Sequence, residues 1–236
     1  MSLLKNIKSK PEPKLESIFK QGGVVLFLAL VALVIMSLAA VALIRSVDTS
    51  TLIAGNLSFK EAATTSADGG VEAAIALLEA MRDDPLNAGK TVSGDATHTF
   101  NVEAKPGYFS SSADPALDLL NDDTWNAANN NAINVTWTTD GLAKSDGSGA
   151  VVTDSSGNRI QYIIQRMCRI KNVRSDRFHC LYSKADVDNN GQEVKLPQNI
   201  CIGLGCPASG QTPQLRVTVR TVGPKNSVSY VQAFVY

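Results

Sequence analysis

The chain has 236 residues, in which 22 acidic side chains balance 22 basic ones, so its formal net charge is zero. This length suits one domain with an additional segment, and it is short for two catalytic domains. The balanced charge argues against a nucleic-acid-binding protein, because such proteins usually carry a clear basic excess.

Residues 1–22 are predicted to form a basic leader peptide. Five lysines stand against two glutamates there, and an uncharged apolar run follows from Val24 to Ile44. That run has about 21 residues, which at about 1.5 Å per helical residue span a hydrocarbon core of roughly 30 Å. Because the lysines keep the amino-terminal side in the cytoplasm, we expect one membrane span and export of everything after Arg45.

Three interpretations of the apolar run compete. Residues 40–42 (Ala-Val-Ala) have the form that signal peptidase accepts, but the run continues beyond them through Ile44. Gly22 and Gly23 instead end the basic leader directly before the run, where prepilin peptidase cuts and leaves the run on the mature protein. A buried core helix is the third interpretation, although such helices rarely run this long without a polar residue.

The helical region is predicted to cover residues 23–84, with 24–44 in the membrane and 45–82 amphipathic. Four residues follow the i, i+3, i+4, i+7 spacing of a helix face that packs on a sheet: Val71, Ala74, Ile75 and Leu78. Pro85 ends the helix, because its ring cannot continue the hydrogen-bond ladder.

Residues 85–236 are predicted to form an exported β-rich domain with long loops. The composition shifts there to Ser, Thr, Asn, Asp and Gly, interrupted by short runs with β propensity. The predicted strands are 97–104, 133–139, 160–170, 215–222 and 227–236. The last two flank a turn at 223–226 and predict an antiparallel hairpin, with Val217 and Val219 toward the helix and Arg216, Thr218 and Arg220 on the other face. We therefore expect an α+β fold in which the long helix packs on an antiparallel sheet.

The four cysteines are Cys168, Cys180, Cys201 and Cys206. An even number in an exported region favours two disulfides over free thiols. Four cysteines permit three connectivities, and we favour the two that close short local loops, Cys168 with Cys180 and Cys201 with Cys206. A zinc site is the alternative, but the spacings are not those of paired zinc knuckles.

Residues 186–191 (Asp-Val-Asp-Asn-Asn-Gly) open like a calcium loop, with Asp186, Asp188 and Asn190 as candidate ligands. The acidic residue required at the twelfth position is replaced by Pro197. A solvated polar turn explains the run equally well. No other cofactor is expected, and calcium at this turn stays open.

Catalytic apparatus is not visible in the sequence, and we expect a protein that is not an enzyme. His98 and His179 are the only histidines, and neither accompanies a recognisable nucleophile motif. We expect both to be surface or strand residues.

Four stretches resemble type IV pilus assembly proteins of the PilX type. Residues 53–57 (Ile-Ala-Gly-Asn-Leu) and 66–71 (Ser-Ala-Asp-Gly-Gly-Val) resemble the amino-terminal region of that family, 159–167 (RIQYIIQRM) an internal strand, and 216–234 its closing hairpin. The resemblance thus covers regions toward both ends of the chain and one internal strand. Asp68 stands where the family carries glutamate, and Gly69 and Gly70 replace alanines. Glycine costs a helix about 1 kcal/mol, so we expect a bend there.

The resemblance implies a pilin-like fold and a minor pilin, a structural subunit that primes assembly of a type IV pilus or sits at its tip and supports adhesion. Its partners would be other minor pilins, the major pilin and prepilin peptidase. It would wait in the bacterial inner membrane, with a periplasmic carboxy-terminal domain, and then enter the extracellular pilus. The residues expected to pack in the filament are Phe27, Leu28, Ala54, Gly55 and Asn56.

One departure from major pilins bears on the place in the filament. Major pilins carry a glutamate at the fifth mature position, which is Phe27 here if cleavage follows Gly22 and Leu28 if it follows Gly23. The K pseudopilin of the type II secretion system also lacks this glutamate and sits at the tip. By analogy we expect an early or apical place, and a K-like tip pseudopilin is an alternative within the same class.

Two further hypotheses place the chain in different functional classes. A single-pass membrane-anchored periplasmic binding domain would keep the leader uncut. A secreted enzyme or lectin would be released after Ala42.

Overall fold

The computed structural model describes residues 22–103, 105–114, 117–126, 129, 131–137, 143–146 and 153–236. The chain divides into two compact units, Met1–Gly55 and Asn56–Tyr236. In chain order the elements are α1 (Gly22–Arg82), η1 (Pro85–Asn87), β1 (Tyr108–Phe109), η2 (Asp122–Trp125), β2 (Ile133–Trp137), β3 (Ala143–Asp146), β4 (Arg159–Arg166), β5 (Leu215–Val222), η4 (Pro224–Asn226) and β6 (Val228–Val235). The predicted leader lies outside the described residues except for Gly22, where α1 begins.

The first unit contributes the apolar part of α1. All residues from 23 to 54 are exposed in the chain, although 24–44 contain no charged residue. Among the described residues, α1 is the one helix that is long and apolar enough to cross a membrane. Within the described residues of this unit, nothing covers these apolar side chains.

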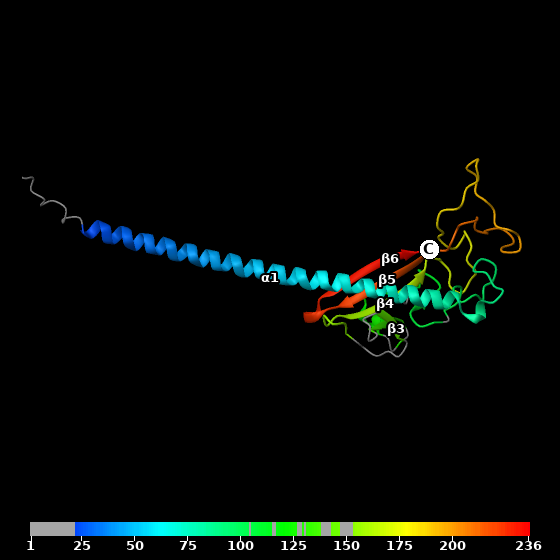
Figure 1. Ribbon diagram of the computed structural model, residues 1–236, viewed down its shortest axis with the longest axis horizontal. Helices are drawn as coiled ribbons and strands as arrows, with labels where there is room; N and C mark the ends of the chain where they lie inside the picture. The colour runs from blue at the N-terminus through cyan, green and yellow to red at the C-terminus, as the bar shows by residue number, and fades with distance from the viewer. Residues whose placement is uncertain are drawn as a thin grey trace, which may run out of the picture. The chain divides into compact units, whose positions relative to one another are not determined.

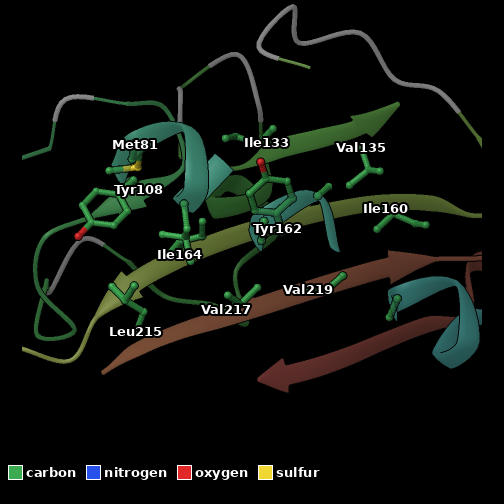
Figure 2. Close-up of a cluster of buried hydrophobic side chains, with 14 residues drawn as sticks. Met81, Tyr108, Ile133, Val135, Ile160, Tyr162, Ile164, Leu215, Val217 and Val219 are labelled. Atoms are coloured by element: carbon green, nitrogen blue, oxygen red, sulfur yellow. The ribbon is translucent and has the colours of Figure 1, made fainter. Parts of the chain in front are cut away.

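In the second unit, α1 packs with one face on the sheet (Figure 2). The buried helix residues recur every three or four positions, which is the spacing of one helix face. They are Ala63, Ala67, Gly70, Ala73, Ala74, Leu78 and Met81. The predicted Ala74 and Leu78 are thus in the core, whereas Ile75 stays 38% exposed at its border.

Gly70 lies on the buried face of α1, against Ile160 of β4 and Val219 of β5. A Cβ atom at this position would lie 2.5 Å from Cγ1 of Val219 and 2.9 Å from Cγ2 of Ile160. The helix is continuous through Gly69 and Gly70, where a bend was expected. Gly70 therefore brings the helix backbone close to β4 and β5, and packing offsets its unfavourable helix propensity.

The sheet has the strand order β3-β2-β4-β5-β6, and β1 pairs with β4 beside this path (Figure 1). Four of its pairings are antiparallel, but β1 runs parallel to β4. The sheet is thus mixed, and the expectation of a purely antiparallel sheet is wrong. Strand β1 has only 2 residues, which is too short to give a recognisable sequence pattern.

The β5–β6 hairpin matches the prediction. The two strands pair from Leu215 with Val235 to Val222 with Val228, and two turn residues, Lys225 and Asn226, have the left-handed φ values 60° and 58°. Val217 and Val219 join the core under α1, as predicted.

The other face of the sheet is also covered. Trp125 of η2 packs on Ile163 in a second, smaller cluster. The guanidinium of Arg220 lies 5.9 Å from the ring centre of Trp125 and pairs with Asp122. As a result Thr218 and Arg220, on the face opposite the helix, are both buried.

The predicted strand 97–104 is wrong. Residues 97–103 form turns, and residue 104 lies outside the described residues. The Thr99 hydroxyl and the Asn87 side-chain amide both donate to the carbonyl of Met81, at 2.9 and 2.7 Å. These side chains supply hydrogen-bond donors to a backbone carbonyl at the end of α1. Such side-chain hydrogen bonds to the backbone compete with strand formation.

Two strand boundaries also differ from the prediction. Strand β4 ends at Arg166 instead of residue 170, and β3 lies between the predicted strands 133–139 and 160–170, where no strand was predicted. Strand β2 ends at Trp137, and residues 138 and 139 of its predicted span lie outside the described residues.

Candidate functional site

The apolar segment of α1 is the first candidate site. Phe27 and Leu28, the two candidates for the fifth mature position, are 65% and 60% exposed. Gly22 and Gly23, the two predicted processing positions, stand at the beginning of the same helix. This surface can contact lipid or other apolar helices, and it has no group suited to catalysis.

The three residues Ala54, Gly55 and Asn56 continue this helix surface. Ala54 and Asn56 are exposed, and Gly55 is half-buried. A Cβ atom at Gly55 would meet no heavy atom within 4 Å. Glycine is therefore not required here by any contact inside the chain, in contrast to Gly70.

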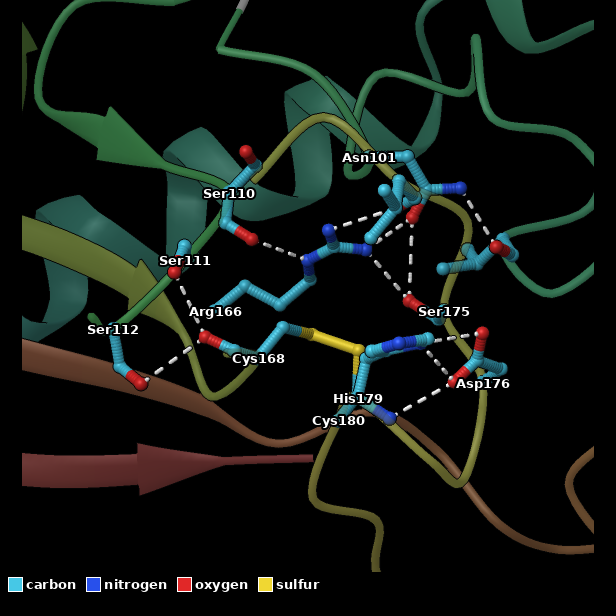
Figure 3. The surroundings of a disulfide bond; sticks show 12 residues. Asn101, Ser110, Ser111, Ser112, Arg166, Cys168, Ser175, Asp176, His179 and Cys180 are labelled. Carbon is cyan, nitrogen blue, oxygen red and sulfur yellow. Dashed lines mark hydrogen bonds and ion pairs between the residues drawn. A yellow bond between two sulfur atoms is a disulfide. The ribbon is translucent and has the colours of Figure 1, made fainter. Parts of the chain in front are cut away.

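The structure pairs Cys168 with Cys180 and Cys201 with Cys206, the same two pairs that the short loops favour. The first disulfide joins residues that also form an antiparallel bridge. On its other side, the carbonyl of Cys168 accepts from the Ser111 hydroxyl at 2.9 Å (Figure 3). Cys168, just after β4, is thus joined to a later segment by the disulfide and to an earlier one by the hydrogen bond from Ser111.

Arg166, the last residue of β4, is fully buried beside this disulfide (Figure 3). Its guanidinium donates to the Ser110 carbonyl at 2.9 Å, to the Ser175 hydroxyl at 2.8 Å and to the side-chain oxygen of Asn101. It also donates to the carbonyl of Val173 at 2.9 Å. All four partners are uncharged, and burial lowers the pKa of Arg166 from its ordinary value.

The Arg166 cluster was not identified as a site from the sequence. The one signal for it was an arginine that follows six uncharged residues, 160–165, in a predicted strand. Its contacts come from residues 101, 110, 173 and 175, which have no common spacing, so the cluster is visible only in the fold. Its closed set of hydrogen bonds stabilises three loops and leaves no reacting group exposed.

The second disulfide closes an exposed apolar loop. Ile202 and Leu204 are 74% and 85% exposed, and a depression of about 390 Å³ lies beside them. The loop is attached to the segment after α1, because the Thr91 hydroxyl donates to the Ile200 carbonyl at 3.0 Å.

The candidate calcium residues lie in a polar turn. One carboxylate oxygen of Asp188 accepts from the backbone amides of Asn190 and Gln192, at 2.9 and 2.8 Å. The Asp186 carboxylate instead accepts from the Ser209 hydroxyl at 3.1 Å. Within the described part of the chain, no three His, Cys, Asp or Glu side chains are grouped so that they could hold a metal ion. This geometry is that of a turn capped by Asp188.

Neither histidine lies in a strand. His98 is buried in a turn and stacks on Phe100, and burial lowers its pKa. The expectation of a surface or strand residue is therefore wrong for His98. His179 is half-buried, with Nδ1 at 2.8 Å from the Asp176 carboxylate.

Comparisons with protein-family models, with curated proteins and with solved structures find no match to this chain.

Proposed function

We propose that the chain is a minor pilin, a structural subunit that enters a type IV pilus through its amino-terminal helix. The observation that carries this proposal is helix α1 itself. It has an uncharged, exposed apolar segment over residues 24–44. The later part of the same helix packs in the core of the disulfide-bearing domain.

The physical basis is the cost of exposing that segment to water. At about 25 cal/mol per Å² of apolar surface, a helix of this kind needs lipid or other apolar helices around it. Because lipid tails and apolar side chains are similar surroundings, the helix can pass from membrane to filament at small cost, and close packing then holds it. The function follows from packing, without catalysis.

The apolar side chains at Phe27 and Leu28 bear on the subunit's place. A carboxylate buried in lipid or among helices needs a partner to neutralise it. A subunit without one needs no neighbour above it, which supports an early or apical position. Its partners would be other minor pilins, the major pilin and prepilin peptidase.

Mapping the mature amino terminus tests the proposal. The full chain would be expressed in bacterial membranes with and without a prepilin peptidase, and its intact mass measured. We expect a membrane-bound product that begins at Gly23 or Val24 only when the peptidase is present. Gly22→Leu and Gly23→Leu serve as matched variants, and the one at the cleaved position should block processing.

The competing hypotheses give different masses in the same experiment. A product that keeps Met1 in the presence of active peptidase would indicate a membrane-anchored binding domain. A soluble product beginning at Leu43 would indicate a secreted protein and would overturn the proposal.

A further inference from the structure

We propose that the outer edge of β6 binds an extended segment of a different polypeptide, with a large apolar side chain seated in the groove at the end of this strand. The proposal goes beyond the pilin function, because it concerns only the second unit and does not depend on whether α1 leaves the membrane.

The first observation is an open strand edge. Strand β6 is last in the strand order, and in the described part of the chain β5 is its only strand partner. Every second residue of an antiparallel strand turns its backbone N–H and C=O away from the neighbour. A row of such groups at strand spacing is complementary to another extended backbone.

The second observation is the composition of that edge. Strand β6 (VSYVQAFV) has 8 residues without a charge, a proline or a glycine. Proteins usually protect open edges with lysine, proline, a bulge or a covering loop. None of the first three is found in β6, and Val228, Tyr230 and Phe234 are exposed on the face away from α1.

The third observation is a groove where β6 ends. A cavity of about 480 Å³ lies there between α1 and the sheet. Val235 at the end of β6 and the following residue, Tyr236, form one side of it. Most of its walls are apolar, among them Ile75, Phe100 and Leu215, and Glu79 and Arg82 of α1 also line it. Because pockets of about 300–1,000 Å³ accept whole small molecules, the groove can hold one large apolar side chain.

Edge and groove together indicate the chemistry of the occupant. Main-chain hydrogen bonds to an open edge supply affinity, and pockets for alternate side chains supply specificity. The segment that fits is extended and uncharged, and it places an aromatic or large aliphatic side chain beside Val235.

A second copy of β6 fits this groove poorly. When two copies of β6 pair, the exposed side chains of both strands must lie on the same face of the sheet. A slip of one residue moves the side chains of one strand to the opposite face. The two antiparallel registers of this kind with the most overlap place Ser227 or Ser229 of the second copy opposite Val235. Either serine would leave the apolar groove unfilled, so the structure favours a different polypeptide.

A synthetic peptide tests the site directly. The probe is a fluorescent peptide as long as β6, with alternating threonine and valine and one phenylalanine near an end. It would be titrated against the full chain in lipid nanodiscs, with empty nanodiscs as a blank. We expect saturable binding, and hydrogen exchange should show new protection of β6 amides.

Two modified peptides separate strand pairing from unspecific apolar contact. N-methylation of alternate residues removes backbone donors and keeps the side chains, and it should abolish binding. Replacement of the phenylalanine by serine should weaken binding by about tenfold or more. Equal binding of the N-methylated peptide, no binding of the parent peptide, or unchanged exchange in β6 would each overturn the proposal.

Matched variants of the chain locate the groove. Ile75→Glu places a carboxylate in the groove wall, whereas Ala76→Glu places one on the neighbouring exposed residue, outside the groove. We expect Ile75→Glu to weaken peptide binding by about tenfold or more and Ala76→Glu to leave it unchanged. Equal effects of the two would remove the groove from the proposal.

A second copy as the occupant has its own test. Gln232→Cys tests the register with Ser229 opposite Val235, in which the two copies of residue 232 face each other, and Val231→Cys tests the register with Ser227 opposite Val235, in which the two copies of residue 231 do. In either register, two copies paired edge to edge would form a disulfide-linked dimer under mild oxidation. We expect no such dimer at protein concentrations where the peptide binds. A near-complete dimer would show that a second copy occupies the edge and would overturn the choice of a different polypeptide.

Discussion

At the scale of single residues, three residues far from any motif hold the second unit together. Gly70 sets the distance between helix and sheet, and Arg166 joins three loops. Asp154 connects helix to sheet, because it accepts from the Ser66 hydroxyl at 2.6 Å and from the Asn158 side chain at 3.0 Å. Each acts through partners that are distant in sequence.

Gly70→Ala is expected to destabilise the protein, although alanine favours helix by about 1 kcal/mol. The new Cβ would collide with the stiff, branched side chains of Val219 and Ile160, and such overpacking costs about 1–3 kcal/mol. Urea unfolding measures the difference. Gly55→Ala is the control, because its Cβ meets open space, and it should leave stability unchanged or raised.

Arg166→Met is expected to lower the free energy of unfolding by about 3 kcal/mol, because it leaves several buried acceptors without a donor. Arg166→Lys should recover little, since an ammonium cannot reproduce the guanidinium geometry. The exposed Arg169 offers a matched control, and Arg169→Met should change stability by less than about 0.5 kcal/mol. A small effect of Arg166→Met would show that water can replace the guanidinium.

The Asp154 carboxylate is expected to make the free energy of unfolding depend on pH. Partial burial alone would raise the pKa of Asp154, but hydrogen bonds from Ser66 and Asn158 outweigh it and hold that pKa below its ordinary value. A lowered folded-state pKa stabilises the protein above the unfolded value of about 3.9, and this contribution is lost as the pH falls through the folded value. Asp154→Asn should therefore be less stable at neutral pH, and the difference should shrink below about pH 4. A difference that is constant with pH would contradict this assignment.

At the scale of elements, the two disulfides hold segments that have little regular structure. Residues 167–214, between β4 and β5, contain isolated bridges and turns in place of long strands. Cys168–Cys180 joins two parts of this segment close to the end of β4, and Cys201–Cys206 closes the exposed apolar loop. Covalent bonds here replace the cooperative hydrogen bonding of a sheet.

Replacement of both cysteines of a pair by serine is expected to destabilise the two segments unequally. Loss of the Cys168–Cys180 disulfide, whose cysteines have a sequence separation of 12, should lower the free energy of unfolding by about 3 kcal/mol. Loss of the Cys201–Cys206 disulfide, with a sequence separation of 5, should lower it by about 2 kcal/mol. Urea unfolding of the two double variants tests this order, and a reversed order would show that native contacts outweigh loop entropy.

At the scale of the whole molecule, the two units have different requirements. The second unit buries its own core, whereas nothing in the described part of the first unit covers its apolar segment. The glycines of α1 reflect this division: Gly70 meets the sheet and Gly55 meets open space. If the proposed function holds, the space at Gly55 is filled by a neighbouring subunit.

Gly55→Leu tests this role of the helix. We expect unchanged stability of the single chain and a loss of filament incorporation of about tenfold or more, because small residues permit close approach of helices. Leu52→Ala, at another exposed position of the same helix, is a comparison in which a side chain is removed. Incorporation can be measured by immunoblotting of sheared filaments, and a normal level of Gly55→Leu would exclude tight packing at this residue.

The sequence by itself determined those features that depend on local order along the chain. The apolar run, the helix end before Pro85, the β5–β6 hairpin and the short disulfide loops all follow from spacing, composition and proline chemistry. Strong periodic segments specify their structure with little help from distant residues.

Only the tertiary structure decided the features that depend on distant partners. It assigned Gly70 to close packing instead of a bend, turned residues 97–103 into a cap for α1, and placed the two-residue β1 parallel to β4. It also assembled the Arg166 cluster and left the β6 edge open beside a groove. The physical reason is that these features depend on contacts between residues far apart in the sequence, and local sequence spacing does not specify such contacts.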